Sequence, residues 1–148
     1  MRVALEMASR SMAAGGPPVG ACVVQAGAVI ARGHNSVIAE LDPTAHAEMV
    51  VLRSAAQTLR RLSLSGCSLY VTLEPCAMCL SACYYAGIDL VCFGAPIASM
   101  AARTGHELCL SSVRLFAGAD TAPEVTGGVL AEECGELIRQ WMPRSIAG

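Results

Sequence analysis

The hydrophobic and polar positions in the first half of the chain predict a helix, a hairpin and a second helix. Apolar residues recur at helical spacing over residues 2–14 and again over about 45–61. Between them, residues 19–25 and 29–33 are short apolar runs joined by a turn around Ala26-Gly27. The pattern therefore places two paired strands between two helices.

The second half of the chain continues this alternation. Residues 69–73 and 88–93 predict strands, and a helix over about 75–86 begins at a proline, which a first helical turn tolerates. We expect a last helix over residues 129–141, and within the less regular stretch 94–118 a short helix and a strand. Strands that alternate with helices predict a layered α/β domain with a partly parallel sheet.

Length and composition favour a single domain without a membrane segment. The chain has 148 residues, which suits one compact domain over residues 1–148. The longest uncharged stretch contains Gly15-Gly16-Pro17-Pro18, which breaks any membrane-spanning helix. Glu6 and Arg10 interrupt the apolar run that a signal peptide needs. We therefore expect a cytoplasmic protein.

The charge balance disfavours a general nucleic-acid-binding surface. The formal net charge is −2, and all 10 basic residues are arginines. Arg53, Arg60 and Arg61 lie close together in a predicted helix, where a solvated helix face explains them. A protein that grips RNA usually carries a visible basic patch.

The cysteines favour free thiols over disulfides. The chain has 8 of them, an even number that a secreted disulfide framework would also have. Most lie in apolar runs such as Gly20-Ala21-Cys22-Val23-Val24, where cysteine acts as a small hydrophobic residue. Because no export signal is visible, we expect the thiols to be reduced.

Two short strings carry the candidate chemistry. They are Thr44-Ala45-His46-Ala47-Glu48 and Glu74-Pro75-Cys76-Ala77-Met78-Cys79. Each opens a predicted helix. One imidazole and two thiolates, from His46, Cys76 and Cys79, make the three protein ligands of a catalytic zinc site, which keeps its fourth position for water.

Glu48 is expected to move protons rather than to bind the metal. Residues two apart do not share a helix face, so His46 must lie at the very start of its helix for both side chains to reach one metal. A carboxylate beside the metal can take a proton from water and give protons to a ring nitrogen and to leaving ammonia. Cys83 follows Cys79 on the same helical face, so it is either a fourth ligand or a packing residue, and we favour packing.

Together these residues resemble the cytidine deaminase-like superfamily of zinc base deaminases, in which His-x-Glu precedes Pro-Cys-x-x-Cys. Longer strings are similar to the branch that holds bacterial guanine deaminases and tRNA adenosine deaminases. Those strings are Asp42-Pro43-Thr44-Ala45-His46-Ala47-Glu48, Leu69-Tyr70-Val71-Thr72-Leu73-Glu74-Pro75-Cys76, Pro18-Val19-Gly20-Ala21 and Gly127-Gly128-Val129-Leu130.

The resemblance implies a three-layer α/β/α domain with a central five-stranded mixed sheet, one zinc ion per chain and a homodimer. It also implies that Asn35 contacts the substrate and that the backbone N–H of Ala47 hydrogen-bonds a ring substituent. Val19 and Pro75 complete the expected substrate-binding set. His34 either binds substrate or packs, and His106 is expected to be exposed.

The chain departs from the tRNA-editing pattern at several points. Members of that group resemble one another in a charged Arg-Asp pair and a Lys-Thr-Gly-Ala-Ala-Gly stretch, where this chain reads Ala95-Pro96-Ile97-Ala98-Ser99-Met100. Its last helix is acidic, whereas theirs tends to be basic. We therefore expect a zinc-dependent hydrolytic deaminase of a small nucleobase or nucleoside of guanine, cytosine or adenine type.

The sequence leaves two alternative functions open. The first is a tRNA-specific adenosine deaminase with the same chemistry, which converts a wobble adenosine to inosine. The second is a non-catalytic, zinc-stabilised partner subunit, against which Glu48 argues because a structural metal site needs no such carboxylate.

Overall fold

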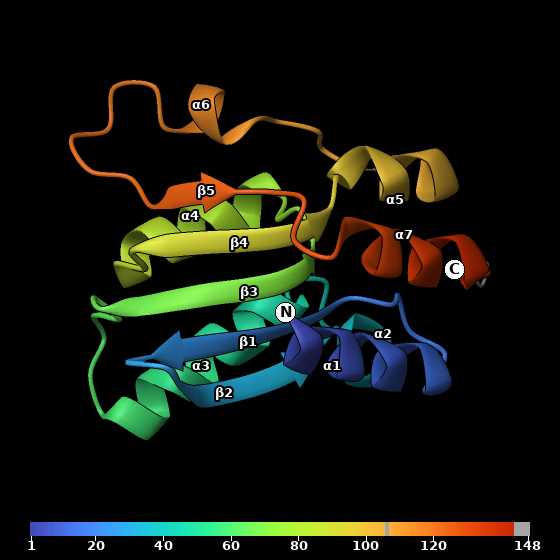
Figure 1. The fold of residues 1–148 in the computed structure, drawn as a ribbon, viewed down its shortest axis with the longest axis horizontal. Helices are drawn as coiled ribbons and strands as arrows, with labels where there is room; N and C mark the ends of the chain where they lie inside the picture. Colours follow the sequence, from blue (N-terminus) through green and yellow to red (C-terminus); the bar gives the residue numbers. More distant parts are fainter. Residues whose placement is uncertain (106, 144–148) are drawn as a thin grey trace.

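The computed structural model describes residues 1–105 and 107–143, which form a sheet between two layers of helices (Figure 1). The strands are β1 (Gly20–Gln25), β2 (Ala28–His34), β3 (Cys67–Leu73), β4 (Leu90–Ala95) and β5 (Glu124–Thr126). The helices are α1 (Arg2–Ala13), α2 (Val37–Glu40), α3 (Ala47–Leu59), α4 (Ala77–Ala86), α5 (Ile97–Thr104), α6 (Ser112–Leu115) and α7 (Ala131–Gln140). The predicted α/β/α fold with a five-stranded mixed sheet is thereby confirmed.

The sheet has the strand order β2-β1-β3-β4-β5. Strand β1 is antiparallel to both β2 and β3, whereas β4 is parallel to both β3 and β5. The tight turn between β1 and β2 has positive φ angles of 49° at Ala26 and 79° at Gly27. Such a turn matches the right-handed twist of paired strands.

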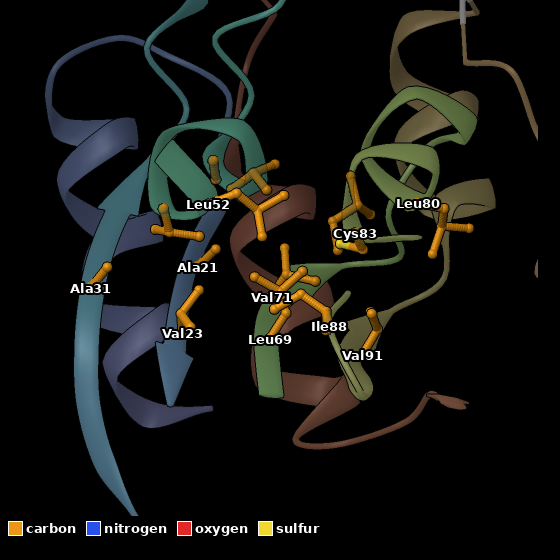
Figure 2. Close-up of a cluster of buried hydrophobic side chains, with 14 of the residues drawn as sticks. Ala21, Val23, Ala31, Leu52, Leu69, Val71, Leu80, Cys83, Ile88 and Val91 are labelled. Carbon is orange, nitrogen blue, oxygen red and sulfur yellow. The ribbon is translucent and has the colours of Figure 1, made fainter. Parts of the chain in front are cut away.

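Helices α1 and α7 cover one face of the sheet, and α3 and α4 cover the other (Figure 1). Figure 2 shows the buried cluster on the second face, where Leu52 of α3 and Leu80 of α4 pack over Val71 and Ile88. Cys83 lies in this same cluster and is fully buried. Helices α3 and α4 are thus held rigidly against the sheet.

The topology brings four chain segments to one edge of the sheet. Because β3 and β4 are parallel, their carboxyl ends meet at this edge, and the antiparallel β1 begins there. Strand β2 ends at the same edge, next to the start of β1. In parallel α/β sheets, ligands bind outside the carboxyl ends of the strands.

The expected elements are present, with ends shifted by a few residues, except in one region. The strand expected within residues 94–118 is wrong, because that stretch holds α5 and α6, and the fifth strand lies at Glu124–Thr126. Strand β5 has only 3 residues and is mostly exposed, so its pairing with β4 leaves no periodic apolar signal. The short α2 was not expected either, and His106 lies outside the described residues.

No helix among the described residues is both long and apolar enough to cross a membrane.

Candidate active site

The metal-ligand candidates lie at the starts of two helices. His46 is the N-cap of α3 and Cys76 is the N-cap of α4, and both have extended backbone angles. A cap residue stands half outside its helix, so its side chain is free to point beyond the helix end. His46 and Glu48 can therefore approach one point, as the sequence spacing requires.

His46, Cys76 and Cys79 come together with the spacing of a zinc site. The Nδ1 atom of His46 lies 3.6 Å from the Sγ atom of Cys79 and 3.8 Å from the Sγ atom of Cys76. A tetrahedral zinc ion with its usual bond lengths sets such donor atoms about 3.6–3.8 Å apart. Among the described residues these three form the one cluster able to hold a metal ion.

The thiols of this cluster already differ in acidity. A hydrogen bond with Cys79, helped by His46, lowers the pKa of Cys76 to about 4. The same contact, together with burial, raises the pKa of Cys79. A bound zinc ion offsets that second effect, because a coordinating thiol is deprotonated. The hydrogen bond with Cys76 also raises the pKa of His46.

Glu48 lies in the first turn of α3, beside the cluster but outside it. Its side chain is only 3% exposed, and it borders the main cavity. Burial raises the pKa of Glu48 to about 7, so this carboxyl group is poised to accept and release a proton near neutral pH. Its carboxylate oxygens do not belong to the metal-ligand cluster.

A cavity of about 600 Å³ opens onto the cluster. Its walls come from the sheet edge, the loop before α3, helix α5 and the start of the C-terminal segment. The apolar part includes Ile97, Met100 and Trp141, and the polar part includes the carboxyl groups of Glu74 and Glu107. A volume of this size, mostly apolar with a few polar groups, suits a small ligand.

The expected substrate-binding residues divide into two groups. Asn35 and Val19 line the cavity, and the N–H of Asn35 donates to the carbonyl of Val19 at 2.9 Å. Ala47 and Pro75 are fully buried and do not border the cavity themselves. A contact between the substrate and the backbone N–H of Ala47 stays a prediction.

The sequence leaves the roles of His34 and Cys83 open, and the structure shows what surrounds each of them. The Nδ1 atom of His34 lies 3.0 Å from the carbonyl oxygen of Asn35, and His34 does not line the cavity. Cys83 lies in the hydrophobic cluster, and burial raises the pKa of its thiol. Both placements favour packing roles.

Several cavity residues were not among the predicted site residues. Glu74 lies within the motif string, but its role depends on a contact with α5 that spacing alone does not reveal. Glu107 and Thr104 come from the region that the sequence pattern described poorly, and Trp141 ends the predicted last helix. The one available signal was an isolated acidic residue, Glu107, between a glycine turn and an apolar run.

A family model described as "Cytidine and deoxycytidylate deaminase zinc-binding region" matches residues 1–95. The chain therefore belongs to this family of zinc-dependent deaminases, as His46, Cys76 and Cys79 indicate. It is a hydrolytic deaminase that converts an exocyclic amino group of a nucleobase or nucleoside to a carbonyl group.

The chain is similar to members with two kinds of substrate. The tRNA-specific adenosine deaminase of Haemophilus influenzae is 40% identical over 139 residues, which cover 93% of this chain and 78% of that protein. The guanine deaminase of Bacillus subtilis is 43% identical over 96 residues, which cover 64% of this chain and 62% of that protein. The structure of a guanine deaminase from Nitrosomonas europaea has a TM-score of 0.84 at 28% identity, covering 93% of this chain and 80% of that one.

Proposed function

We propose that this enzyme deaminates a free base or nucleoside, with His46, Cys76 and Cys79 holding one zinc ion and Glu48 transferring protons. Bound zinc supplies the Lewis acidity that activates water for attack on the amino-bearing ring carbon. Glu48 would take one proton from that water and give it to the ring nitrogen, and would then take the second proton from the new hydroxyl group and give it to the amino group, which leaves as ammonia while the carbonyl forms. Its burial supports this role, because a pKa of about 7 allows both steps.

The observation that carries the choice of substrate is the charge of the cavity. Among the described residues that line it away from the metal ligands, Glu74 and Glu107 are acidic and none is an arginine or lysine. A concave site lined by one sign of charge repels ligands of that sign. A phosphate near this opening is therefore disfavoured, whereas an uncharged base or nucleoside is accepted.

Two polar side chains are suited to orient a base. The Thr104 hydroxyl donates to the Oε1 atom of Glu107 at 3.1 Å, which holds the carboxylate at the cavity wall. A carboxylate accepts hydrogen bonds, so it favours a base edge with adjacent N–H groups, such as that of guanine. The Oδ1 atom of Asn35 accepts from the N–H of Val37 at 3.2 Å, so its amide NH₂ group remains to donate to a ring acceptor.

An ammonia-release screen tests this choice. We expect turnover of at least one compound among guanine, cytosine, adenine and their nucleosides, and little inosine in an anticodon stem-loop that carries a wobble adenosine. If guanine is the substrate, Glu107→Gln should lower kcat/KM by about 10- to 100-fold, because the amide lacks the charge that strengthens hydrogen bonds to the base and replaces one acceptor oxygen with an NH₂ donor. The exposed Glu40→Gln is the matched control.

Inosine in the stem-loop, with every free base and nucleoside inert, would instead establish the tRNA-editing function. That second candidate is favoured by the similarity to the Haemophilus influenzae enzyme across most of both chains. In that case the rate should fall steeply as salt rises, since phosphate contacts release counterions.

We further propose a homodimer that forms through the outer face of α4 and α6. Tyr85 of α4 is 85% exposed and Val113 of α6 is 81% exposed, and Tyr84 stacks on Phe116 to join the two elements. Large exposed apolar side chains that gather on one face mark an interaction surface.

All 8 cysteines are free, which supports a reducing compartment such as the cytoplasm.

Light scattering tests the dimer. We expect twice the monomer mass at micromolar concentration, and we expect Tyr85→Arg to shift the protein toward the monomer because it places a charge in the apolar contact. Leu62→Arg changes a 90% exposed leucine in the loop after α3 and should leave the mass unchanged. A monomeric wild type would refute the proposal.

A further inference from the structure

Helix α5 forms one wall of the cavity, yet little of it packs against the sheet. Ile97, Met100 and Thr104 all border the cavity, and Glu107 follows shortly after the helix ends. Figure 1 shows α5 beyond the edge of the sheet, next to α7. The position of this helix therefore decides the width of the substrate site.

The first turn of α5 is held by Glu74. The backbone N–H of Ile97 donates to the Oε2 atom of Glu74 at 3.0 Å. The backbone N–H of Glu74 in turn donates to the carbonyl oxygen of Ala95 at 2.8 Å. The N-cap residue of α5 is Pro96, which makes no side-chain cap hydrogen bond. Glu74 thus supplies the acceptor and the negative charge that a helix start favours.

The last turn of α5 is held by Arg103. Its Nη2 atom donates to the carbonyl oxygen of Trp141, just beyond the end of α7. Trp141 is 8% exposed, belongs to the core cluster and borders the cavity. Arg103 therefore ties α5 to the C-terminal segment that completes the same wall.

We propose that Glu74 and Arg103 are positioning residues, each fixing one end of α5 so that together they set the width of the substrate cavity. Neither residue needs to touch the reacting atoms. Glu74 acts through the first turn of α5 and Arg103 through Trp141. The proposal rests on the proposed function only for the choice of substrate in the kinetic arm of its test.

The chain's only tryptophan gives a readout that needs no substrate. In Arg103→Ala the carbonyl of Trp141 loses its partner, so acrylamide should quench Trp141 fluorescence more strongly than in the wild type. Glu74→Ala should raise quenching less, because it frees the opposite end of the helix. Each Ala variant should keep about one zinc ion per chain, since neither side chain is a ligand.

The kinetic arm separates positioning from general stability. With whichever compound the screen identifies, KM should rise about 3- to 10-fold in both Ala variants while kcat changes less, because displaced walls weaken substrate binding before they alter the metal site. Glu74→Gln keeps an acceptor oxygen but loses the charge, so its KM should lie between those of the wild type and Glu74→Ala. Glu40→Ala and Arg32→Ala, both exposed positions, are the matched controls.

Loss of zinc in Glu74→Ala would overturn the proposal, because Glu74 would then support the metal loop. Unchanged quenching and KM in Arg103→Ala would overturn it as well. If an Ala variant does not fold, Glu74→Gln and Arg103→Gln are measured in its place. We expect quenching close to that of the wild type in Glu74→Gln and raised quenching in Arg103→Gln. If no compound in the screen is turned over, the proposed function fails, while the fluorescence result still decides the role of Arg103.

Discussion

Glu48→Gln should fold and keep its zinc but release ammonia about 10²- to 10⁴-fold more slowly, the usual contribution of a general acid–base group. The amide has nearly the same shape as the carboxyl group and cannot accept and return a proton. Because burial raises the pKa of Glu48, the fold favours its uncharged form, and a neutral side chain of the same shape removes no buried charge that the fold depends on. Steady-state kinetics and elemental analysis of one preparation measure both properties.

The exposed Glu124→Gln serves as the control for Glu48→Gln and should match the wild type in rate and zinc content. Loss of zinc from Glu48→Gln alone would make Glu48 a ligand. Wild-type turnover in that variant would remove it from the chemistry altogether. Either result would contradict the assigned role.

Cys79→Ala should lower the zinc content from about one ion per chain to almost none, and activity should disappear with the metal. Cys79 supplies one of three ligand atoms, which all lie within 4.8 Å of one another. Removing it leaves His46 and Cys76, two ligands that cannot complete the site. Elemental analysis after dialysis against a weak chelator measures the loss.

Cys83→Ala is a closely matched control, because Cys83 is also a fully buried cysteine of α4. It should keep its zinc while losing some thermal stability, because a buried side chain is shortened in the core. If Cys83→Ala loses zinc as completely as Cys79→Ala, Cys83 is a fourth ligand and the site is structural.

The metal cluster could be predicted from the sequence because local spacing determines it. His46 and Cys76 each begin a helix, so helix geometry alone places Glu48 and Cys79 beside them. Outside residues 94–118, the expected strands and long helices were found for a similar reason, since each has an apolar face several residues long. Only the ends of these elements shifted.

The cavity wall could not be predicted in the same way. Glu107 and Trp141 border the same cavity although they lie 34 positions apart in the chain, which leaves no local pattern. The short α6 depends on a hydrogen bond from the N–H of Arg114 to the Ser111 hydroxyl, and β5 depends on pairing with β4. Neither element is long enough to show the repeating apolar face on which a sequence pattern depends.

Deamination in water enriched with oxygen-18 tests whether water supplies the new carbonyl oxygen. We expect one heavy oxygen atom in each product molecule, at the carbon that lost its nitrogen, and one ammonia released per product. Turnover should stop when a chelator removes the zinc and return when zinc is restored. Product without the heavy oxygen, or undiminished turnover by the zinc-free protein, would contradict the account.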